Sequence, residues 1–211
     1  MTERAEAIAA AGSAARVALE ATHQAREITL PASRAAIRAC AVAIRAVQRH
    51  EFDDARAHIA DARAHLDRAA AATADQGSVR HAGFLQDAYK EYAEANLTLA
   101  FIEGGPLPAA DELGVDAPSY LNGMAEAASE LRRQVLDLLR AGDADRAEEL
   151  FGVMDDVYSL LVTVDYPDAV TGGLRRTTDA LRAVLERTRG DVTNATVAAR
   201  FQAAVERTQR A

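Results

Sequence analysis

Apolar residues recur at every third or fourth position through most of the chain, and no stretch alternates strictly between apolar and polar residues. This spacing is typical of amphipathic α-helices rather than of β-strands. Glycine, proline and helix-capping residues interrupt the pattern and predict about seven helical segments, with the first two separate or continuous across Pro31. The predicted segments are residues 3–28, 31–49, 53–74, 79–103, 118–141, 145–163, 170–188 and 193–209.

Short connections join these segments, apart from a loop over residues 104–117, and no repeat of fixed period is visible. Helices joined in this way pack as antiparallel neighbours. We therefore expect an all-α antiparallel bundle that forms one domain over residues 1–211. Alanine is abundant and aromatic residues make up only 5% of the chain, which indicates helices that approach closely through small side chains.

The number of cysteines and the length of the apolar runs bear on the cellular compartment of the protein. Cys40 is the only cysteine, so no intramolecular disulfide can form and a reducing cytoplasm is expected. No apolar run is long enough to span a membrane. The first residues also lack the basic start and apolar stretch of a signal peptide. We expect a cytoplasmic protein with no membrane partner.

Two pairs of acids on predicted helices point to chemistry. Glu91 and Glu94 form one pair, and Glu126 and Glu130 form the other, each at a spacing of three or four residues. At that spacing both carboxylates of a pair lie on one helix face and repel each other. The residue four positions after Glu94 is Thr98 and the one four positions after Glu130 is Gln134, so no base offsets the repulsion at that spacing. Uncompensated acids from two helices could hold a divalent cation, which indicates metal-assisted chemistry.

A helical wheel treats the two pairs differently. Glu91 and Glu94 belong to a polar stripe that flanks the apolar face of their helix, so partial burial is expected. Glu126 and Glu130 lie nearly opposite the apolar face of theirs, which is also the pattern of ordinary solvated acids. Gly123 lies three residues before Glu126 and would permit a neighbouring backbone to come close.

The formal net charge of −8 argues at face value against phosphate-rich partners. Lys90 is the only lysine, however, so the other basic side chains are arginines, whose planar guanidinium suits bidentate phosphate contacts. Arg34 and Arg38 lie one helical turn apart and Arg45 lies two turns further on. They could form an aligned row that contacts phosphates, or a solvated face paired with acids.

Several short elements occur in an order that resembles the translin and translin-associated factor X family. They include Arg26-Glu-Ile-Thr29, Ser119-Tyr-Leu-Asn-Gly123, Ala128-Ser-Glu-Leu-Arg132 and Asp155-Asp-Val-Tyr158, and the similarity runs through most of the chain. The resemblance implies a seven-helix translin-like subunit. It also implies a hollow, roughly eight-membered homo-oligomeric shell that binds single-stranded RNA or single-stranded DNA inside.

Resemblance to the factor X branch implies an endoribonuclease that depends on Mg²⁺, with Mn²⁺ as the alternative ion. The metal-binding and catalytic acids of that branch fall on Glu91, Glu94, Glu126 and Glu130 of this sequence. The third acid is usually aspartate in that family, so Glu126 has one extra methylene and a longer ligand arm. A shell would also explain acids that face away from the subunit core, because they could line an enclosed cavity.

The resemblance also assigns a nucleic-acid-binding basic segment. Arg80, His81 and Lys90 are the nearest match to it in this sequence, and they lie on the same predicted helix, residues 79–103, as the first acid pair. Together with the arginine row on the first helix, they are the expected contacts to single-stranded RNA.

Three other readings remain open. A translin-like protein could bind single-stranded RNA or DNA without cutting it. An all-α nucleoside triphosphate pyrophosphatase also uses two acid pairs, although the spacing of Glu126 and Glu130 departs from its usual pattern. His58, Asp61 and His65 have a spacing that could bind a transition metal, but the arginines around them count against this.

Overall fold

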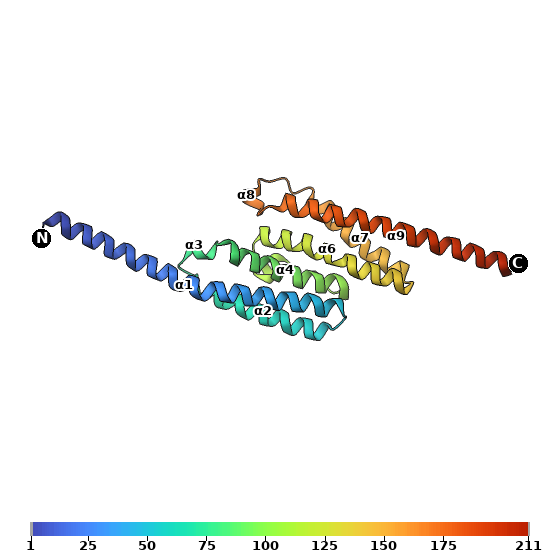
Figure 1. Ribbon diagram of the computed structural model, residues 1–211, viewed down its shortest axis with the longest axis horizontal. Helices are drawn as coiled ribbons and strands as arrows, with labels where there is room; N and C mark the ends of the chain where they lie inside the picture. The colour runs from blue at the N-terminus through green and yellow to red at the C-terminus, as the bar shows by residue number, and fades with distance from the viewer. Residues whose placement is uncertain (1, 211) are drawn as a thin grey trace.

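The computed structural model describes residues 2–210, and six long helices account for most of them (Figure 1). These are α1 (Glu3–Gln48), α2 (Phe52–Ala72), α4 (Gly83–Glu103), α6 (Ala117–Ala141), α7 (Ala144–Leu161) and α9 (Leu174–Arg210). Three one-turn helices lie in the connections: α3 (Gly77–Arg80), α5 (Ala110–Leu113) and α8 (Asp168–Thr171). Residues 2–210 contain no strand, and the predicted all-α fold class is confirmed.

The central pair of the bundle is α4 and α6, which pack against each other. On one side α1 and α2 pack together and both contact α4, whereas on the other side α7 and α9 pack together and both contact α6 (Figure 1). Both central helices are therefore covered on two sides. Among the described residues, no helix is long and apolar enough to cross a membrane.

Helix boundaries differ from the sequence prediction at several places. The predicted helix 79–103 begins only at Gly83, after the separate helix α3, so Arg80 and His81 lie outside α4. The predicted loop 104–117 contains α5, and the predicted segment 170–188 begins at Leu174, after α8.

Two predicted breaks are also absent. The segments 3–28 and 31–49 form one helix, α1, which continues through Pro31 because residues on both sides of it, such as Thr29 and Ala36, are buried against the bundle. The segments 170–188 and 193–209 are likewise joined in α9, where Arg132 donates hydrogen bonds to Thr188 and Asp191 on either side of Gly190. Tertiary packing outweighs the local helix-breaking tendency at both places.

Small side chains let the helices come close together. Alanines from α1, α2, α4 and α6 are fully buried in the core, and Gly123 marks the tightest approach. A Cβ at Gly123 would lie 2.7 Å from the carbonyl oxygen of Lys90 and 2.9 Å from the amide nitrogen of Glu94. The α6 helix thus touches the backbone of α4, as the glycine at this position led us to expect.

We predict that Gly123→Ala lowers the free energy of unfolding by about 1–3 kcal/mol, because the added methyl group must push two helix backbones apart. For a chain of this size the melting temperature should fall by about 2–4 °C for each kcal/mol. Thermal unfolding followed by circular dichroism would measure the shift.

Gly152→Ala on α7 is the matched control, because nothing lies within 4 Å of a Cβ built there. The methyl group should leave stability unchanged or raise it by about 0.5–1 kcal/mol, as alanine does elsewhere inside helices. Equal melting temperatures for the two variants would contradict the close approach of α4 and α6.

Candidate metal centre

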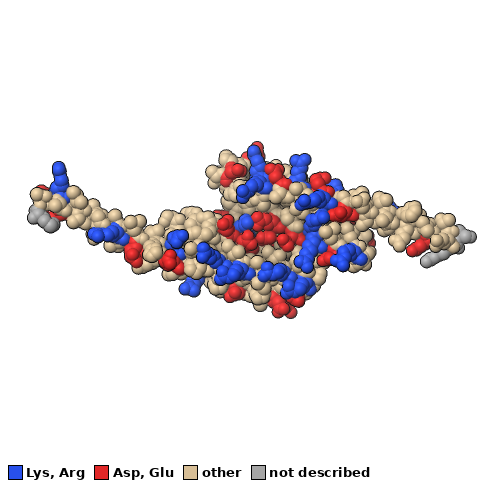
Figure 2. All heavy atoms as spheres, in the orientation of Figure 1, with Lys and Arg blue, Asp and Glu red and all other residues tan. Residues whose placement is uncertain are grey.

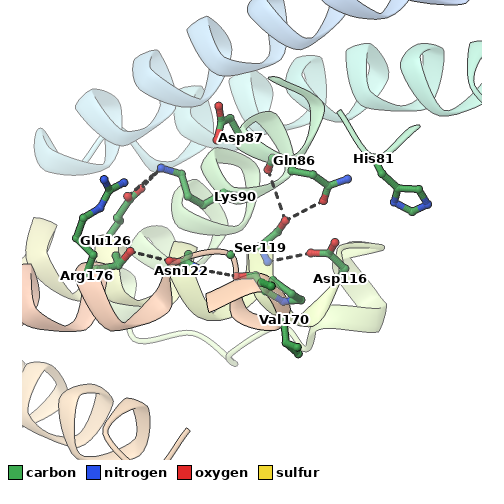
Figure 3. Close-up of a pocket in the computed structure, with 14 residues that line it drawn as sticks. His81, Gln86, Asp87, Lys90, Asp116, Ser119, Asn122, Glu126, Val170 and Arg176 are labelled. Carbon is green, nitrogen blue, oxygen red and sulfur yellow. Dashed lines mark hydrogen bonds and ion pairs between the residues drawn. The ribbon is translucent and has the colours of Figure 1, made fainter. Parts of the chain in front are cut away.

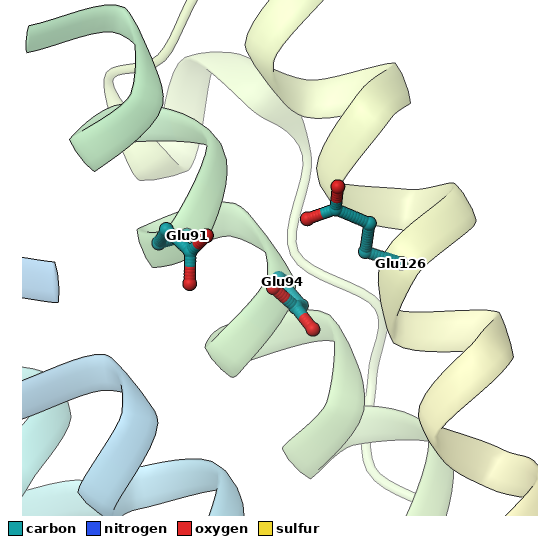
Figure 4. Close-up of side chains that lie close together, drawn as sticks. All are labelled: Glu91, Glu94 and Glu126. Atoms are coloured by element: carbon teal, nitrogen blue, oxygen red, sulfur yellow. The ribbon is translucent and has the colours of Figure 1, made fainter. Parts of the chain in front are cut away.

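Three of the four glutamates singled out in the sequence come together where α4 and α6 cross (Figure 4). Glu91 and Glu94 project from α4 and Glu126 projects from α6, and one carboxylate oxygen from each lies within 4.8 Å of the others. Twice the usual Mg²⁺–oxygen distance is about 4.2 Å, so small side-chain movements would bring all three oxygens around one ion.

Glu94 has the least favourable surroundings of the three. Glu94 is only 7% exposed, and its carboxylate makes no hydrogen bond or ion pair with another described residue. Burial raises the pKa of Glu94 to about 9, and the charges of Glu91, Glu126 and Glu130 add to the shift. A buried carboxyl group without a donor needs either a proton or a cation.

Glu91 is half-buried beside it. Burial raises the pKa of Glu91, and the neighbouring Glu126 charge raises it further, whereas the ammonium group of Lys90 works in the opposite direction. Both acids of α4 therefore resist ionisation. The field of the cluster attracts cations, and every ligand atom in it is a carboxylate oxygen, which hard ions such as Mg²⁺ and Mn²⁺ prefer.

The structure places Glu130 next to this group rather than within it. Its carboxylate accepts a hydrogen bond of 3.2 Å from the amide nitrogen of Gln48, which also donates to the Glu130 backbone carbonyl at 3.0 Å. Gln48 is buried at the end of α1. Gln48 is not among the predicted site residues, and its only signal in the sequence is a polar residue at the end of an apolar run.

Lys90, which was predicted from the sequence only as a contact to nucleic acid, lies among the acids. Its ammonium nitrogen is 2.8 Å from the Glu126 carboxylate and 3.5 Å from that of Glu91. Burial alone would lower the pKa of Lys90, but the hydrogen bond and charge of Glu126, with the charges of Glu91 and Glu94, raise it overall. Lys90 is therefore a protonated counter-ion of the cluster.

The predicted arginine row lies on the solvent-exposed side of α1. Arg34, Arg38 and Arg45 are all exposed, and none of them forms an ion pair with another described residue. Figure 2 shows acidic side chains gathered in the middle of one face of the molecule, with a row of basic side chains along the lower edge of that patch. Unpaired guanidinium groups of this kind are available to phosphates.

A pocket of about 340 Å³ opens beside the cluster and shares Lys90 and Glu126 with it (Figure 3). His81 lines the pocket, and Arg80 precedes it at the end of α3; both are exposed. Arg176 from α9 also lines the pocket. The predicted basic segment thus lies along an approach to the acids.

The histidine arrangement on α2 does not form a comparable site. His65 lies 3.6 Å from Asp61, but His58 does not join them in a group of ligand atoms. Among the described residues, Glu91, Glu94 and Glu126 are the one group of three whose ligand atoms lie close enough to share a metal ion.

No family model matches the chain. A curated relative, the uncharacterized protein MJ0175 of Methanocaldococcus jannaschii, is 35% identical over 112 residues. The match covers 52% of this chain and 50% of the relative, so it spans about half the length of each.

Solved structures match far more of the chain. The structure of AfC3PO in complex with duplex RNA has a TM-score of 0.81 and 29% sequence identity, and the match covers 88% of this chain and 96% of that one. A crystal structure of AfC3PO has a TM-score of 0.80 and 29% sequence identity, and the match covers 88% of this chain and 97% of that one. Apo-NeC3PO has a TM-score of 0.76 at 16% identity over 92% of this chain and 98% of its own, a likeness of fold alone.

The buried Glu94 makes stability depend on pH. Because the pKa is about 9 in the folded chain and near the ordinary 4.5 when unfolded, only the folded state holds this proton between those values. The free energy of unfolding should therefore fall as pH rises from about 5 to 9. We predict that Glu94→Gln, studied in EDTA, reduces this fall and raises the melting temperature at pH 8.

Thermal melts of wild type and variant between pH 5 and pH 9 would test this prediction, with Glu148→Gln on the exposed face of α7 as the control. The melting temperature of Glu94→Gln at pH 8 should rise by about 2–4 °C for each kcal/mol by which the substitution increases the free energy of unfolding. Parallel curves for wild type and Glu94→Gln would contradict a strongly raised pKa.

Proposed function

We propose that this protein, which belongs to the translin family, binds RNA and cleaves single strands of it with the help of a divalent metal ion. The observation that carries the proposal is the cluster at the α4–α6 crossing. Glu94 is buried without a hydrogen-bond donor, and carboxylate oxygens of Glu91 and Glu126 lie within 4.8 Å. Such a set of hard oxygen ligands fits Mg²⁺ or Mn²⁺.

A divalent ion at this position supplies Lewis acidity toward a phosphate and activates water near neutral pH. The residues that would hold it are Glu91 and Glu94 from α4 and Glu126 from α6. Glu130 stands beside them with its carboxylate fixed by Gln48, so it can accept a proton from the attacking water or take part as a further ligand. The longer arm of Glu126 still reaches the two acids of α4.

RNA is favoured as the substrate by the basic groups around the acids. The exposed arginines of α1 can contact successive phosphates along a strand, and His81 and Arg176 line the pocket next to Glu126. AfC3PO has been solved in complex with duplex RNA, which supports RNA as the ligand class. Single-stranded DNA shares the phosphate chemistry and is the natural competitor.

Assembly with further copies of this chain is favoured by the ends of the two longest helices. In Figure 1 the start of α1 and the end of α9 project from opposite ends of the body. Residues 2–21 are exposed, as are Val197 and Phe201. The projecting part of α1 leaves the apolar side chains of Ile8, Val17 and Leu19 in solvent, and contact with other copies in a shell would bury them.

We predict that the purified protein cleaves an unstructured, end-labelled single-stranded RNA in Mg²⁺, and that Glu94→Gln lowers the single-turnover rate at least about 100-fold. The substitution keeps the shape of the side chain and removes its charge. RNA affinity, measured by fluorescence anisotropy in EDTA, should not fall. Duplex RNA and single-stranded DNA of the same sequence are the comparison substrates.

Glu148→Gln is the matched control and should cleave like wild type, since its side chain is exposed on α7. Binding without cleavage by the wild type in either Mg²⁺ or Mn²⁺ would instead support a non-catalytic RNA-binding protein. Hydrolysis of free nucleoside triphosphates with no action on RNA would support the pyrophosphatase reading.

A second prediction concerns the arginine row. The triple variant Arg34→Gln, Arg38→Gln and Arg45→Gln should weaken RNA binding and reduce the dependence of log affinity on log salt by about 2, because each phosphate contact to a single strand contributes about 0.7. Anisotropy titrations between about 50 and 200 mM salt would measure the slope.

The charge-matched control replaces three exposed arginines of α9 by glutamine: Arg182, Arg187 and Arg200. Both variants lose the same net charge, so any difference between their slopes reports local contacts. Equal slopes for the two would remove the arginines of α1 from the RNA-binding surface.

A further inference from the structure

Lys90 contacts both carboxylate oxygens of Glu126, one of the proposed metal ligands. Its ammonium nitrogen lies 2.8 Å from Oε1 and also 2.8 Å from Oε2 of Glu126, and 3.5 Å from Oε1 of Glu91. Both oxygens of Glu126 thus contact a single cation. Lys90 is the only lysine in a chain whose other basic residues are arginines. Unlike the planar guanidinium group of arginine, the lysine ammonium group is a compact point charge on a flexible stem.

A divalent ion at the cluster would need the same oxygens. Two cations that share one carboxylate repel each other, and this repulsion is strong where water is largely excluded. The side chains of Lys90, Glu91 and Glu126 are only 24%, 26% and 33% exposed. Lys90 and the metal therefore compete for Glu126, rather than binding it independently.

Resting on the function proposed above, we propose that Lys90 is an internal counter-cation that a divalent ion displaces from Glu126, and that the released ammonium group then turns into the adjacent pocket to hold a phosphate of the RNA substrate. The role is one of positioning and exchange. Lys90 balances the acids before the ion arrives and becomes a phosphate contact afterwards.

The pocket provides the space for this movement. Lys90 already lines it, and the pocket volume of about 340 Å³ is large enough for a four-carbon stem to turn without moving a helix. Figure 3 shows Arg176 at the end of the pocket where Lys90 and Glu126 lie. Asp87 and Asp116 also line the pocket, so an anion has to be held on the Arg176 side.

Asn122, which forms part of the pocket wall, does not compete for the ammonium group. Asn122 donates to the carbonyl oxygens of Pro118 and Thr171, and its own oxygen accepts from Thr177 at 2.6 Å. These hydrogen bonds fix the wall beneath the pocket. A phosphate placed between Arg176 and a released Lys90 would meet two cations of different geometry, one planar and one compact.

The test measures binding of Mn²⁺ alone, by electron paramagnetic resonance titration of full-length protein at neutral pH. Lys90→Gln should bind Mn²⁺ roughly tenfold more tightly than wild type, because the competing charge is gone. Lys90→Arg, which retains a cation, should stay near the wild-type affinity. Arg187→Gln is the control and should leave Mn²⁺ affinity unchanged, because it removes one positive charge from an exposed residue of α9 that does not line the pocket.

A second readout separates competition from simple structural damage. At saturating Mn²⁺, Lys90→Gln should raise the KM for single-stranded RNA more than it lowers kcat, because a phosphate contact is lost while the metal is retained. A variant that is merely misfolded would lose Mn²⁺ affinity as well. Tighter metal binding together with weaker RNA binding is the combination that the inference requires.

The outcomes distinguish this inference from the function on which it rests. If wild type binds Mn²⁺ and Lys90→Gln binds it equally or more weakly, the exchange role is overturned and the proposed function stands. If neither protein binds Mn²⁺ while Glu94→Gln behaves identically to both, the metal centre itself is wrong and both proposals fall.

Discussion

The arrangement of the site depends on the contact between the backbones of α4 and α6. At Gly123 the two helices are so close that even a methyl group would lie 2.7 Å from a carbonyl oxygen of α4. This distance brings Glu126, one turn further along α6, to within 4.8 Å of Glu91 and Glu94. A larger side chain at the crossing would increase the separation of the helices and disperse the acids. The arrangement of the cluster therefore depends on the absence of a Cβ atom at Gly123.

Such closeness has an electrostatic cost for the fold. Glu94 is buried among like charges, and the same field extends to the core residue Cys40, where burial, followed by the charges of Glu91 and Glu94, raises the pKa of the thiol to about 12. Lys90 offsets part of this cost through Glu126. Unfavourable charge of this kind persists where the surrounding packing holds it, and it is typical of functional sites.

The sequence predicted the helices and the acids better than the way in which they meet. Periodicity locates every long helix, but joining segments across Pro31 and Gly190 depends on tertiary packing that local rules do not contain. The helical wheel placed Glu126 away from the core because it weighs large apolar residues. In the structure α6 has a second packing face, built of small residues around Gly123, that this weighting overlooks. Gln48 could not be assigned, since its partner lies 82 residues away.

The net charge of −8 makes the long-range field of the chain unfavourable for RNA. Attraction must therefore act over short distances, where screening by salt is least effective. The arginines Arg34, Arg38 and Arg45 are exposed along α1, and the inner end of the same helix carries Gln48, which holds Glu130. One rigid helix thus connects the basic row to the acids. A nucleic-acid strand held along that row, as proposed above, would be brought to the cluster in a fixed position, so the geometry of α1 can compensate for a field that repels nucleic acid at a distance.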